Sequence, residues 1–327
     1  MYKEIQNYLG ADWLSFKTLF TESLKSRMPQ LNKINEYLFI HGGKQIRPMF
    51  TLLIAKALRG FCNDNVIRCA AAVEMLHTAT LLHDDVADDA SMRRGAPTVK
   101  ALFSPTASVL VGDFWLSRAI ESIVRYCDKE VIYCFSKCLE DLAEGEMIQM
   151  EKASTLETTE DDYIAIIYRK TASLFEAAMK SAAISIEASN SELEAVTGYA
   201  YHIGLSFQIM DDIFDYCPEL GTGKPAGLDI LEKKITLPLF GAFNNAPDLE
   251  ARELKARIRS IGFDKEVDMK VVSDTTDFVH RYNGLEYAKN RLKEEVTAAI
   301  DSISEIPSSE AKGYLESLAE YMACRVR

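Results

Sequence analysis

The sequence has few residues that break helices, and its cysteines do not form a metal-binding or disulfide pattern. Its 327 residues include only 16 glycines and 9 prolines. No Asn-Gly or Asp-Gly pair lies between two alternating apolar and polar segments, as a β-hairpin would require. The seven cysteines are odd in number and form no C-x-x-C pair, which argues against a zinc site. We therefore expect a helix-rich protein with reduced thiols.

Long apolar runs and an excess of positive charge are also absent. No apolar segment approaches the ~20 residues that span a bilayer. The beginning of the chain, MYKEIQNYLG, lacks the basic and apolar regions of a signal peptide. The formal net charge of -12 argues against nucleic-acid binding, which needs a clustered basic surface. These absences predict a cytoplasmic protein without a transmembrane segment.

Helical patterns cover most of the chain. The segment 47–60 has Pro48 near its start and Gly60 at its end, the usual order of these residues around a helix. Apolar residues recur at helical spacing in five further segments, 69–88, 108–126, 130–151, 161–186 and 191–216. Ser308 or Ser309 could cap a last helix. The prediction is an all-α fold in which residues 1–327 form a single domain.

Two acidic clusters of the form D-D-x-x-D end two of these helical segments. They are Asp84-Asp85-Val86-Ala87-Asp88 and Asp211-Asp212-Ile213-Phe214-Asp215. Residues i and i+4 share a helix face, where like charges repel one another. Carboxylates without cysteine or histidine suit Mg²⁺, which usually completes its coordination with substrate phosphates. One such cluster is most simply a solvated or capping group, but two of the same form favour a metal site.

Basic residues lie near both clusters in the sequence. Arg93-Arg94-Gly95 follows the first cluster, and Gly42-Gly43-Lys44 and Arg47 precede it at a predicted helix start. A helix N-terminus with flanking cations is a natural phosphate site. Further candidates are Lys170, Lys224, Lys233 and Lys234. Each alone is most simply a surface charge. Together they predict two diphosphate sites, one bridged by metals and one held by lysine and arginine alone.

In the order of its motifs, the chain resembles the trans-isoprenyl diphosphate synthases of the polyprenyl synthetase family. The motifs are GGKxxRP, ExxHxxTLLHDDxxDxxxxRRG, Gly112-Asp113, Lys170-Thr171, FQxxDDxxD and a lysine-bearing loop that ends TLP. Each motif is modestly specific, whereas the ordered set is very specific. The resemblance implies one large helical bundle of the isoprenoid synthase type around a deep central cavity. It also implies a homodimer, with peripheral membrane contact as a possible route of product release.

The resemblance also implies roles for individual residues. Three Mg²⁺ ions, with Mn²⁺ as a substitute, would bind to Asp84, Asp85, Asp88, Asp211, Asp212 and Asp215. The allylic diphosphate would also contact Arg93, Lys170 and Lys224, with Lys234 as a helper. Isopentenyl diphosphate, which carries no metal, would contact Lys44, Arg47, His77 and Arg94. The dipoles of Thr171 and Gln208 would point at the carbocation.

Three positions need a separate comment. His77 precedes Asp84 by seven residues and so lies on the same helical stripe, although a helix-packing histidine is the alternative. Gln45 stands where many family members have arginine, which removes one cation from the isopentenyl region. Lys233 stands where a glycine is common, so either Lys233 or Lys234 could contact the diphosphate.

The residues before the first cluster bear on product length. In this family, bulky aromatic residues four and five positions before the cluster stop chain growth, and here these positions are Ala79 and Thr80. Earlier on the same predicted helix, and so farther from the cluster, Leu76 and Val73 are not aromatic either. We therefore expect a long all-trans product, from hexaprenyl to decaprenyl, with octaprenyl at the centre. Geranylgeranyl diphosphate is the alternative, because Trp115 or Phe135 could close the tunnel.

The implied reaction condenses isopentenyl diphosphate with an allylic diphosphate, farnesyl or geranylgeranyl, by ionisation, condensation and loss of a proton. A class I terpene cyclase would share the fold and the first cluster, but it would need no isopentenyl site. A non-catalytic partner subunit would tend to lack some aspartates, and all six are present here. Both alternatives therefore fit the sequence less well than the synthase prediction does.

Overall fold

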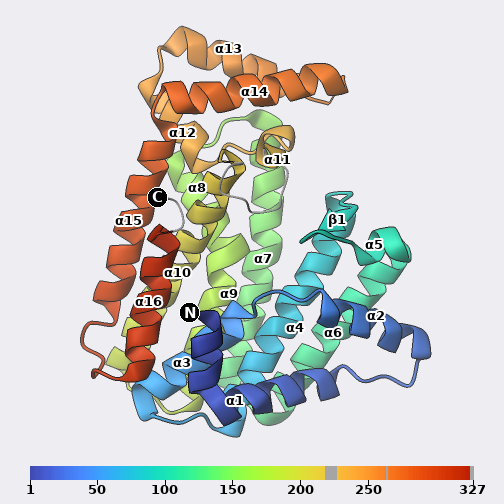
Figure 1. Cartoon of the computed structure of the whole chain (residues 1–327), viewed down its shortest axis with the longest axis vertical. Helices are drawn as coiled ribbons and strands as arrows, with labels where there is room; N and C mark the ends of the chain where they lie inside the picture. The colour runs from blue at the N-terminus through green and yellow to red at the C-terminus, as the bar shows by residue number, and fades with distance from the viewer. Residues whose placement is uncertain (218–226, 263, 325–327) are drawn as a thin grey trace. The chain divides into compact units, whose positions relative to one another are not determined.

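Helices form nearly all of the described structure, a computed structural model that covers residues 1–217, 227–262 and 264–324 (Figure 1). The chain divides into two compact units. The first unit contains residues 1–137, 174–197 and 303–316, and the second contains residues 138–173, 198–302 and 317–327. The all-α prediction is confirmed, whereas a single domain over residues 1–327 stays a prediction.

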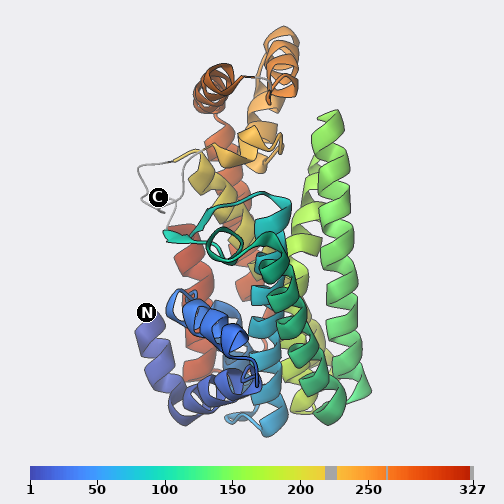
Figure 2. The same ribbon diagram turned by 90° about the vertical axis from the view of Figure 1, so that its right-hand side faces the viewer.

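In the first unit, α4 is the central helix and carries the first acidic cluster at its end. It packs against α1, α3 and α6, and Figures 1 and 2 show α4 and α6 side by side. The bounds of the first helices are α1 Tyr2–Ser23, α2 Pro29–Ile40, α3 Ile46–Arg59, α4 Asp64–Ala87, α5 Val99–Leu102 and α6 Pro105–Tyr126. The rings of Phe50 and Phe175 meet edge to face inside this unit, with their centroids 5.7 Å apart.

The second unit contains most of α7, all of α8, the later part of α10, helices α11 to α15 and the end of α16. Its core includes Tyr216, Leu239, Val271 and Val279, and α12 packs against α14 and α15. The remaining helices are α7 Lys129–Thr155, α8 Glu160–Ile167, α9 Ser173–Ser185, α10 Asn190–Asp215, α11 Leu228–Leu231, α12 Leu237–Asn245, α13 Asp248–Arg259, α14 Lys265–Arg281, α15 Gly284–Ser302 and α16 Glu310–Cys324.

Side chains and glycine define several helix ends. Gly60 ends α3 with a left-handed φ of 78°, and its N–H donates to the Lys56 carbonyl, as its place in the sequence predicts. Ser309 caps α16 through a hydrogen bond that its Oγ accepts from the Lys312 N–H. The α4 helix begins five residues earlier than the apolar pattern predicts, because the Asn63 side chain accepts from the Val66 N–H.

A π-helix interrupts the segment predicted as one helix over 161–186. This segment, η1, spans Tyr168–Ala172 between α8 and α9. Gly204 of α10 lies against it, and a Cβ there would collide with the Cα and Cβ of Ala172. Single π-turns of this kind occur frequently at functional sites. Both Lys170 and Thr171 lie in this one.

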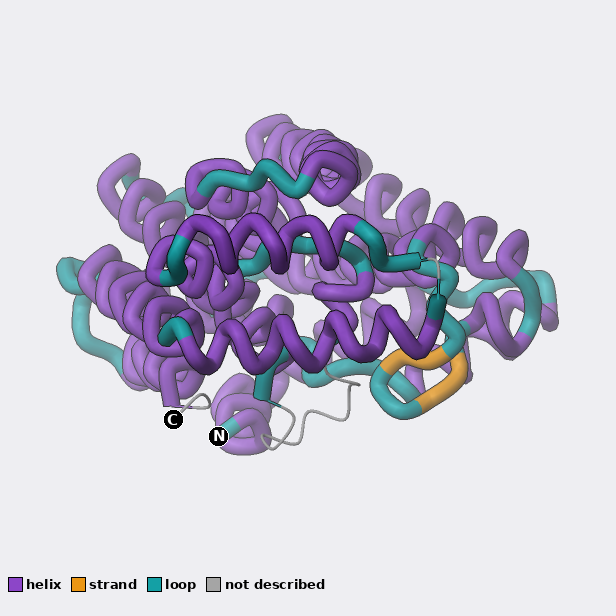
Figure 3. The backbone as a smooth tube through the Cα atoms, turned by 90° about the horizontal axis from the view of Figure 1, so that it is seen from above, coloured by secondary structure: helices purple, strands orange, loops and turns teal. Residues whose placement is uncertain are grey.

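A short β-hairpin follows the first acidic cluster, and the sequence analysis did not predict it. The strands β1 Met92–Arg93 and β2 Ala96–Pro97 pair in antiparallel fashion, and Figure 3 shows them in orange. The turn residues Arg94 and Gly95 have φ values of 53° and 75°. Positive φ at both central residues is the requirement of a type I′ turn. The sequence did not predict this hairpin for two reasons. Its strands are too short to show an alternation of apolar and polar residues, and Arg94 takes a turn position where asparagine is usual.

Among the described residues, no helix is both long and apolar enough to cross a bilayer.

The contact between Gly204 and Ala172 leads to a first prediction. Gly204→Ala should lower the free energy of unfolding by about 1–3 kcal/mol, because the added methyl overfills a packed contact. Gly313→Ala on α16 is the matched control, since a Cβ at Gly313 meets no atom within 4 Å. Helix propensity should make that control more stable by roughly 0.5–1 kcal/mol. Urea unfolding measures both, and equal effects of the two changes would contradict the packing argument.

Candidate active site

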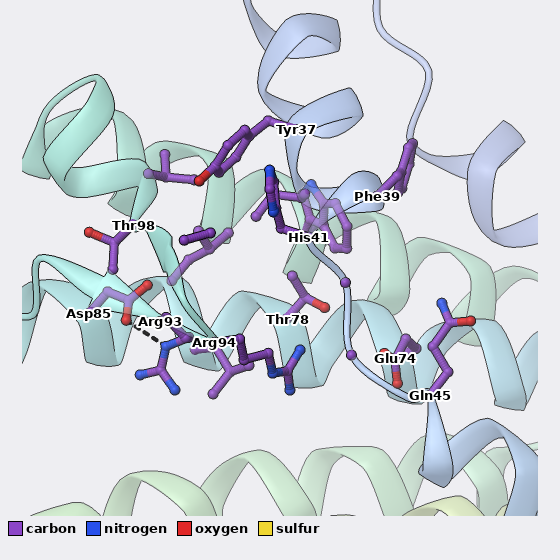
Figure 4. A pocket seen from close by; sticks show the side chains of 18 of the residues that line it. Tyr37, Phe39, His41, Gln45, Glu74, Thr78, Asp85, Arg93, Arg94 and Thr98 are labelled. Atoms are coloured by element: carbon purple, nitrogen blue, oxygen red, sulfur yellow. Dashed lines mark hydrogen bonds and ion pairs between the residues drawn. The ribbon is translucent and has the colours of Figure 1, made fainter. Parts of the chain in front are cut away.

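The first acidic cluster occupies the last turn of α4. The Asp88 N–H donates to the Asp84 carbonyl at 2.8 Å, so the two aspartates lie one helical turn apart. Asp84 is partly exposed and Asp88 is exposed, whereas Asp85 is buried, with 3% of its surface accessible. The Arg93 Nε donates to the Asp85 Oδ1 at 2.6 Å, as Figure 4 shows. The hairpin therefore anchors the middle aspartate of this cluster.

The second cluster has the same design at the end of α10. Asp212 is buried, with 3% accessible, while Asp211 and Asp215 are partly exposed. The Tyr163 hydroxyl donates to the Asp212 Oδ2 at 2.6 Å, and the Gln208 Nε2 donates to the Oδ1 at 2.8 Å. In both clusters, therefore, the middle carboxylate is fixed by a partner and the (i, i+4) pair remains nearer the surface.

A further carboxylate, Asp229 of α11, lies beside the second cluster, and no sequence pattern singled it out. The backbone N–H groups of Leu228 and Asp229 each donate to an oxygen of Asp215 at 3.2 Å. Burial and the charge of Asp215 raise the pKa of Asp229 to about 7, although Lys234 opposes this shift. Burial and the charge of Asp229 also raise the pKa of Asp212 well above its usual range. Negative charge is thus crowded here in a way that a bound cation would relieve.

The carboxylates of the two clusters suit a hard divalent cation that takes only part of its coordination from the protein. Within the part of the chain that the structure describes, no three His, Cys, Asp or Glu side chains are grouped closely enough to hold a metal ion. Mg²⁺ commonly takes only one or two carboxylates and fills its remaining positions with water and phosphate oxygens. A paired (i, i+4) carboxylate beside an anchored one matches that requirement.

The π-helix connects its own residues to the second cluster. The Thr171 Oγ1 donates to the Gln208 Oε1 at 2.7 Å, and the same Gln208 amide donates to Asp212. The structure thus brings the predicted pair Thr171 and Gln208 together and orients the glutamine dipole. The Lys170 Nζ donates to the Gln149 Oε1 at 3.0 Å and forms an ion pair with Glu146. These two α7 residues were missed by the sequence analysis, because their contact with Lys170 joins separate helices.

The structure separates the two adjacent lysines after the second cluster. The Lys233 Nζ donates to the Arg259 carbonyl at 3.2 Å. The Lys234 Nζ forms an ion pair with Glu232 and lies 4.0 Å from the Asp229 Oδ1. This placement favours Lys234 over Lys233 as the lysine near the acidic cluster. Lys224 lies outside the described residues.

A cation-rich group surrounds a buried carboxylate in the first unit. Glu74 of α4 is 6% exposed. Burial raises its pKa, while the positive charges of Arg47, Arg94 and Lys17 act in the opposite direction. The Arg47 guanidinium is also buried and stacks over the Phe175 ring at 4.5 Å. Glu74, to which the sequence analysis gave no role, therefore lies within electrostatic reach of the predicted residues Arg47 and Arg94.

The nearby His77 lies among positive charges that disfavour its protonated form. Burial and the charges of Arg47, Arg94 and Arg93 keep the pKa of His77 well below its usual range. A neutral imidazole can donate a hydrogen bond from one ring nitrogen without adding charge.

Lys44, a further predicted residue of this region, is exposed. Its Nζ lies 5.0 Å from the centroid of the Tyr2 ring.

A cavity adjoins this group, and Figure 4 shows its polar wall. It is lined by Arg93 and Arg94 of the hairpin, by Gly43, and by aromatic residues that include Trp115. A Cβ at Gly43 would come within 2.5 Å of the Arg94 Nη1, so a larger residue there would displace the guanidinium from its present position. Gln45 also lines the cavity and accepts a hydrogen bond from the Lys17 Nζ at 3.1 Å. The Lys17 ammonium, from α1, therefore places a positive charge beside the uncharged Gln45.

The predicted length-determining residues lie on α4, one to two turns before the first cluster. Leu76 and Ala79 are buried, and the partly exposed Thr80 donates its hydroxyl to the His77 carbonyl at 2.9 Å. The Ala79 carbonyl faces Gly112 of α6, where a Cβ would lie 3.2 Å from it. Trp115, farther along α6, donates its indole N–H to the Asn35 Oδ1 at 2.8 Å. This bond fixes the ring of Trp115.

Comparison with known proteins gives a consistent result. Residues 28–275 match the family model described as polyprenyl synthetase. The octaprenyl diphosphate synthase of Haemophilus influenzae is 38% identical over 317 residues, which is 97% of this chain and 94% of that protein. The all-trans-nonaprenyl-diphosphate synthase (geranyl-diphosphate specific) of Rhodobacter capsulatus is 34% identical over 320 residues, 98% of this chain and 96% of that protein.

Two solved structures are similar over their whole length. The crystal structure of a decaprenyl diphosphate synthase from Rhodobacter capsulatus has a TM-score of 0.93 at 32% identity and covers 100% of both chains. A polyprenyl synthase from Caulobacter crescentus CB15, complexed with calcium and isoprenyl diphosphate, has a TM-score of 0.91 at 31% identity. That similarity covers 100% of this chain and 98% of the other.

The crowding around Asp229 generates a prediction about pH. Because the folded protein raises this pKa from 3.8 to about 7, the charged form is disfavoured and metal-free protein should lose stability as pH rises from about 4 through 7. Asp229→Asn should abolish that loss and, at pH 8, raise the free energy of unfolding by roughly 1–4 kcal/mol. Near pH 4 the variant and wild type should agree.

Urea unfolding in the presence of a chelator measures this difference. Asp277→Asn, at an exposed position of α14, is the control and should change stability by less than about 0.5 kcal/mol at either pH. A saturating divalent cation should stabilise the wild type more than Asp229→Asn. If the variant were less stable than the wild type at pH 8, the crowding argument would be wrong.

Proposed function

The chain belongs to the polyprenyl synthetase family, and from this membership we propose that it makes a long-chain all-trans polyprenyl diphosphate. It is a prenyltransferase that joins isopentenyl diphosphate to an allylic diphosphate, farnesyl or geranylgeranyl. The observation that carries the proposal is the repeated design of the two acidic clusters. In each, the middle aspartate is buried and hydrogen-bonded beside an (i, i+4) pair. Such geometry suits metal–diphosphate binding.

The proposed metal is Mg²⁺, in three ions, with Mn²⁺ as a substitute. Enzymes of this family use a divalent metal, and the Caulobacter crescentus relative was crystallised with calcium and isoprenyl diphosphate. The proposed ligands are Asp84, Asp85, Asp88, Asp211, Asp212 and Asp215. Partners of the ligating groups, such as Arg93 on Asp85 and Tyr163 on Asp212, would fix their orientation. Bound metal ions would neutralise the diphosphate as it leaves the allylic carbon.

On the allylic side, the protein holds the leaving group and shields the carbocation. Arg93, Lys170 and Lys224 are the proposed cations on the allylic diphosphate, with Lys234 as a helper. Glu146 and Gln149 hold the Lys170 ammonium in position. Ionisation of the allylic C–O bond creates a carbocation, toward which Thr171 and the oriented amide of Gln208 present their dipoles. Exclusion of water by the apolar side chains prevents premature capture of that cation.

On the isopentenyl side, the protein binds a diphosphate without metal. Lys44, Arg47 and Arg94 supply the charge, and neutral His77 supplies a hydrogen bond. The homoallylic double bond attacks the carbocation, and a proton then leaves to the released diphosphate. No protein nucleophile is needed. Arg47 and Arg94 both act electrostatically on the buried carboxylate of Glu74, which supports their place in one group.

Other parts of the proposal come from the family resemblance. We expect a homodimer, a cytoplasmic location and peripheral membrane contact during release of the apolar product. Gel filtration with light scattering measures the first of these directly.

A metal-dependent assay tests the function. Purified protein, Mg²⁺, isopentenyl diphosphate and labelled farnesyl or geranylgeranyl diphosphate should give all-trans products from hexaprenyl to decaprenyl, resolved by mass spectrometry. Asp84→Asn and Asp211→Asn should each lower kcat by about 100-fold or more, since each removes a charge that holds metal. Absence of elongation in Mg²⁺ would refute the proposal. A cyclised hydrocarbon would indicate a terpene cyclase, and a geranylgeranyl product would indicate the shorter-chain alternative.

Product length gives a separate prediction about Ala79. The change Ala79→Tyr should shorten the main product by several isoprene units, because an aromatic ring would block the path along α4 below the cluster. Ala79→Ser is the matched control and should leave the length unchanged. Mass spectrometry of the products measures both. An unchanged length in a folded, active Ala79→Tyr variant would show that α4 does not form the floor of the tunnel.

A further inference from the structure

The motif Gly112-Asp113 of α6 takes no part in the proposed reaction, yet it lies against the last turns of α4. Its contact there is His83, the residue directly before Asp84. A Cβ at Gly112 would come within 2.3 Å of the His83 Nε2 and 2.6 Å of its Cδ2. A larger residue at this position would therefore displace the imidazole, so glycine makes room for the ring where the two helices meet.

The His83 Nε2 faces two acceptors of α6. It lies 3.3 Å from the Val109 carbonyl oxygen and 3.3 Å from the Asp113 Oδ1. Val109 and Asp113 are four residues apart, so they lie one turn apart on the same face of α6. Because a carbonyl and a carboxylate both accept hydrogen bonds, the Nε2 carries the proton that points toward them. The imidazole thus connects α4 to two consecutive turns of α6.

Ser108 makes a second connection between the same two helices. This fully buried residue of α6 donates its hydroxyl to the Leu82 carbonyl at 2.8 Å. The Leu82 carbonyl and the His83 ring are both bound from α6, directly before Asp84. Since α4 ends at Ala87, these contacts lie close to the end of the helix, where opening of the backbone is easiest.

These contacts bear on the first acidic cluster because the end of a helix opens with a free energy near zero. The Arg93 side chain fixes Asp85 from the hairpin. His83 and Ser108 fix the backbone that leads into Asp84 from the other side, on α6. Since the His83 and Asp113 side chains are 35% and 60% exposed, their contact adds little to global stability, and its effect is local.

We propose that His83 is a positioning residue for Asp84, held by Asp113 and given room by Gly112. The inference rests on the proposed function, in which Asp84 is a metal ligand, and it gives the Gly112-Asp113 motif a role at that site. His83 touches neither metal nor substrate. It keeps the last turn of α4 closed, so that binding of metal and diphosphate does not have to order that turn.

Hydrogen exchange of the metal-free protein tests the positioning role without turnover. The amide of Asp88, which donates to the Asp84 carbonyl, should exchange roughly 3- to 10-fold faster in His83→Ala. This factor is the loss expected for one hydrogen bond and one partly exposed polar contact. Asp64→Asn, at the exposed first turn of the same helix and ~30 Å from Asp84, is the matched control and should leave that rate unchanged.

Calorimetric titration with inorganic pyrophosphate, in Mg²⁺ and in chelator, extends the test to a ligand. In Mg²⁺ the affinity of His83→Ala should fall about two- to fivefold, because fewer molecules have the last turn closed. In chelator it should be unchanged, since the groups proposed for the metal-free diphosphate remain.

Two further variants separate positioning from a purely structural role. His83→Gln should regain the wild-type exchange rate and affinity, because its amide places an N–H near the position of the Nε2. Asp113→Ala should act in the same direction as His83→Ala. Added to His83→Ala, however, it should have no further effect, since its partner is already absent.

The outcomes distinguish this inference from the proposed function. Unchanged exchange of the Asp88 amide in His83→Ala would overturn the inference, whatever the activity. Faster exchange along all of α4, without recovery in His83→Gln, would assign His83 a structural role and also overturn it. Thermal unfolding checks that His83→Ala is folded, and Asp113→Ala decides the same question if it is not. Failure of the wild type to elongate any primer would instead overturn the proposed function.

Discussion

Repulsion between closely spaced carboxylates is the constraint on which the candidate site depends. Two aspartates one turn apart, with a third between them, destabilise a helix unless opposite charge or hydrogen bonds compensate. The protein compensates the middle carboxylate in each cluster, through Arg93 on Asp85 and through Tyr163 and Gln208 on Asp212. Anchoring that carboxylate fixes its orientation at the end of the helix, beside the two flanking aspartates.

Basic side chains gather around a buried carboxylate in the first unit. The positive charges of Arg47, Arg94 and Lys17 act on Glu74, and Arg94 also feels the charge of Asp85. The ligands that we propose for the two regions are a metal-bound diphosphate at the acidic clusters and a metal-free diphosphate at the basic group. Preorganised charge is the common principle of the proposed chemistry.

Departures from regular backbone place several of the functional side chains. A π-helix carries Lys170 and Thr171, and a type I′ turn carries Arg94 with a left-handed φ. Glycine permits the close approach in both places, at Gly204 against the π-helix and at Gly43 against the Arg94 guanidinium. The strain of such positions is compensated by packing around them, as is common where a site needs a fixed geometry.

The sequence by itself determined the helical class and both acidic clusters, because helical spacing is local, and the order of its motifs identified the family. It did not reveal the hairpin at Arg94, the π-helix, or the surroundings of Glu74, Tyr163 and Lys17. Contacts such as Lys17 with Gln45, 28 residues apart, and Tyr163 with Asp212, 49 residues apart, join separate helices. Only tertiary packing decides such contacts, because burial and hydrogen bonding between distant residues have no periodic signal in the chain.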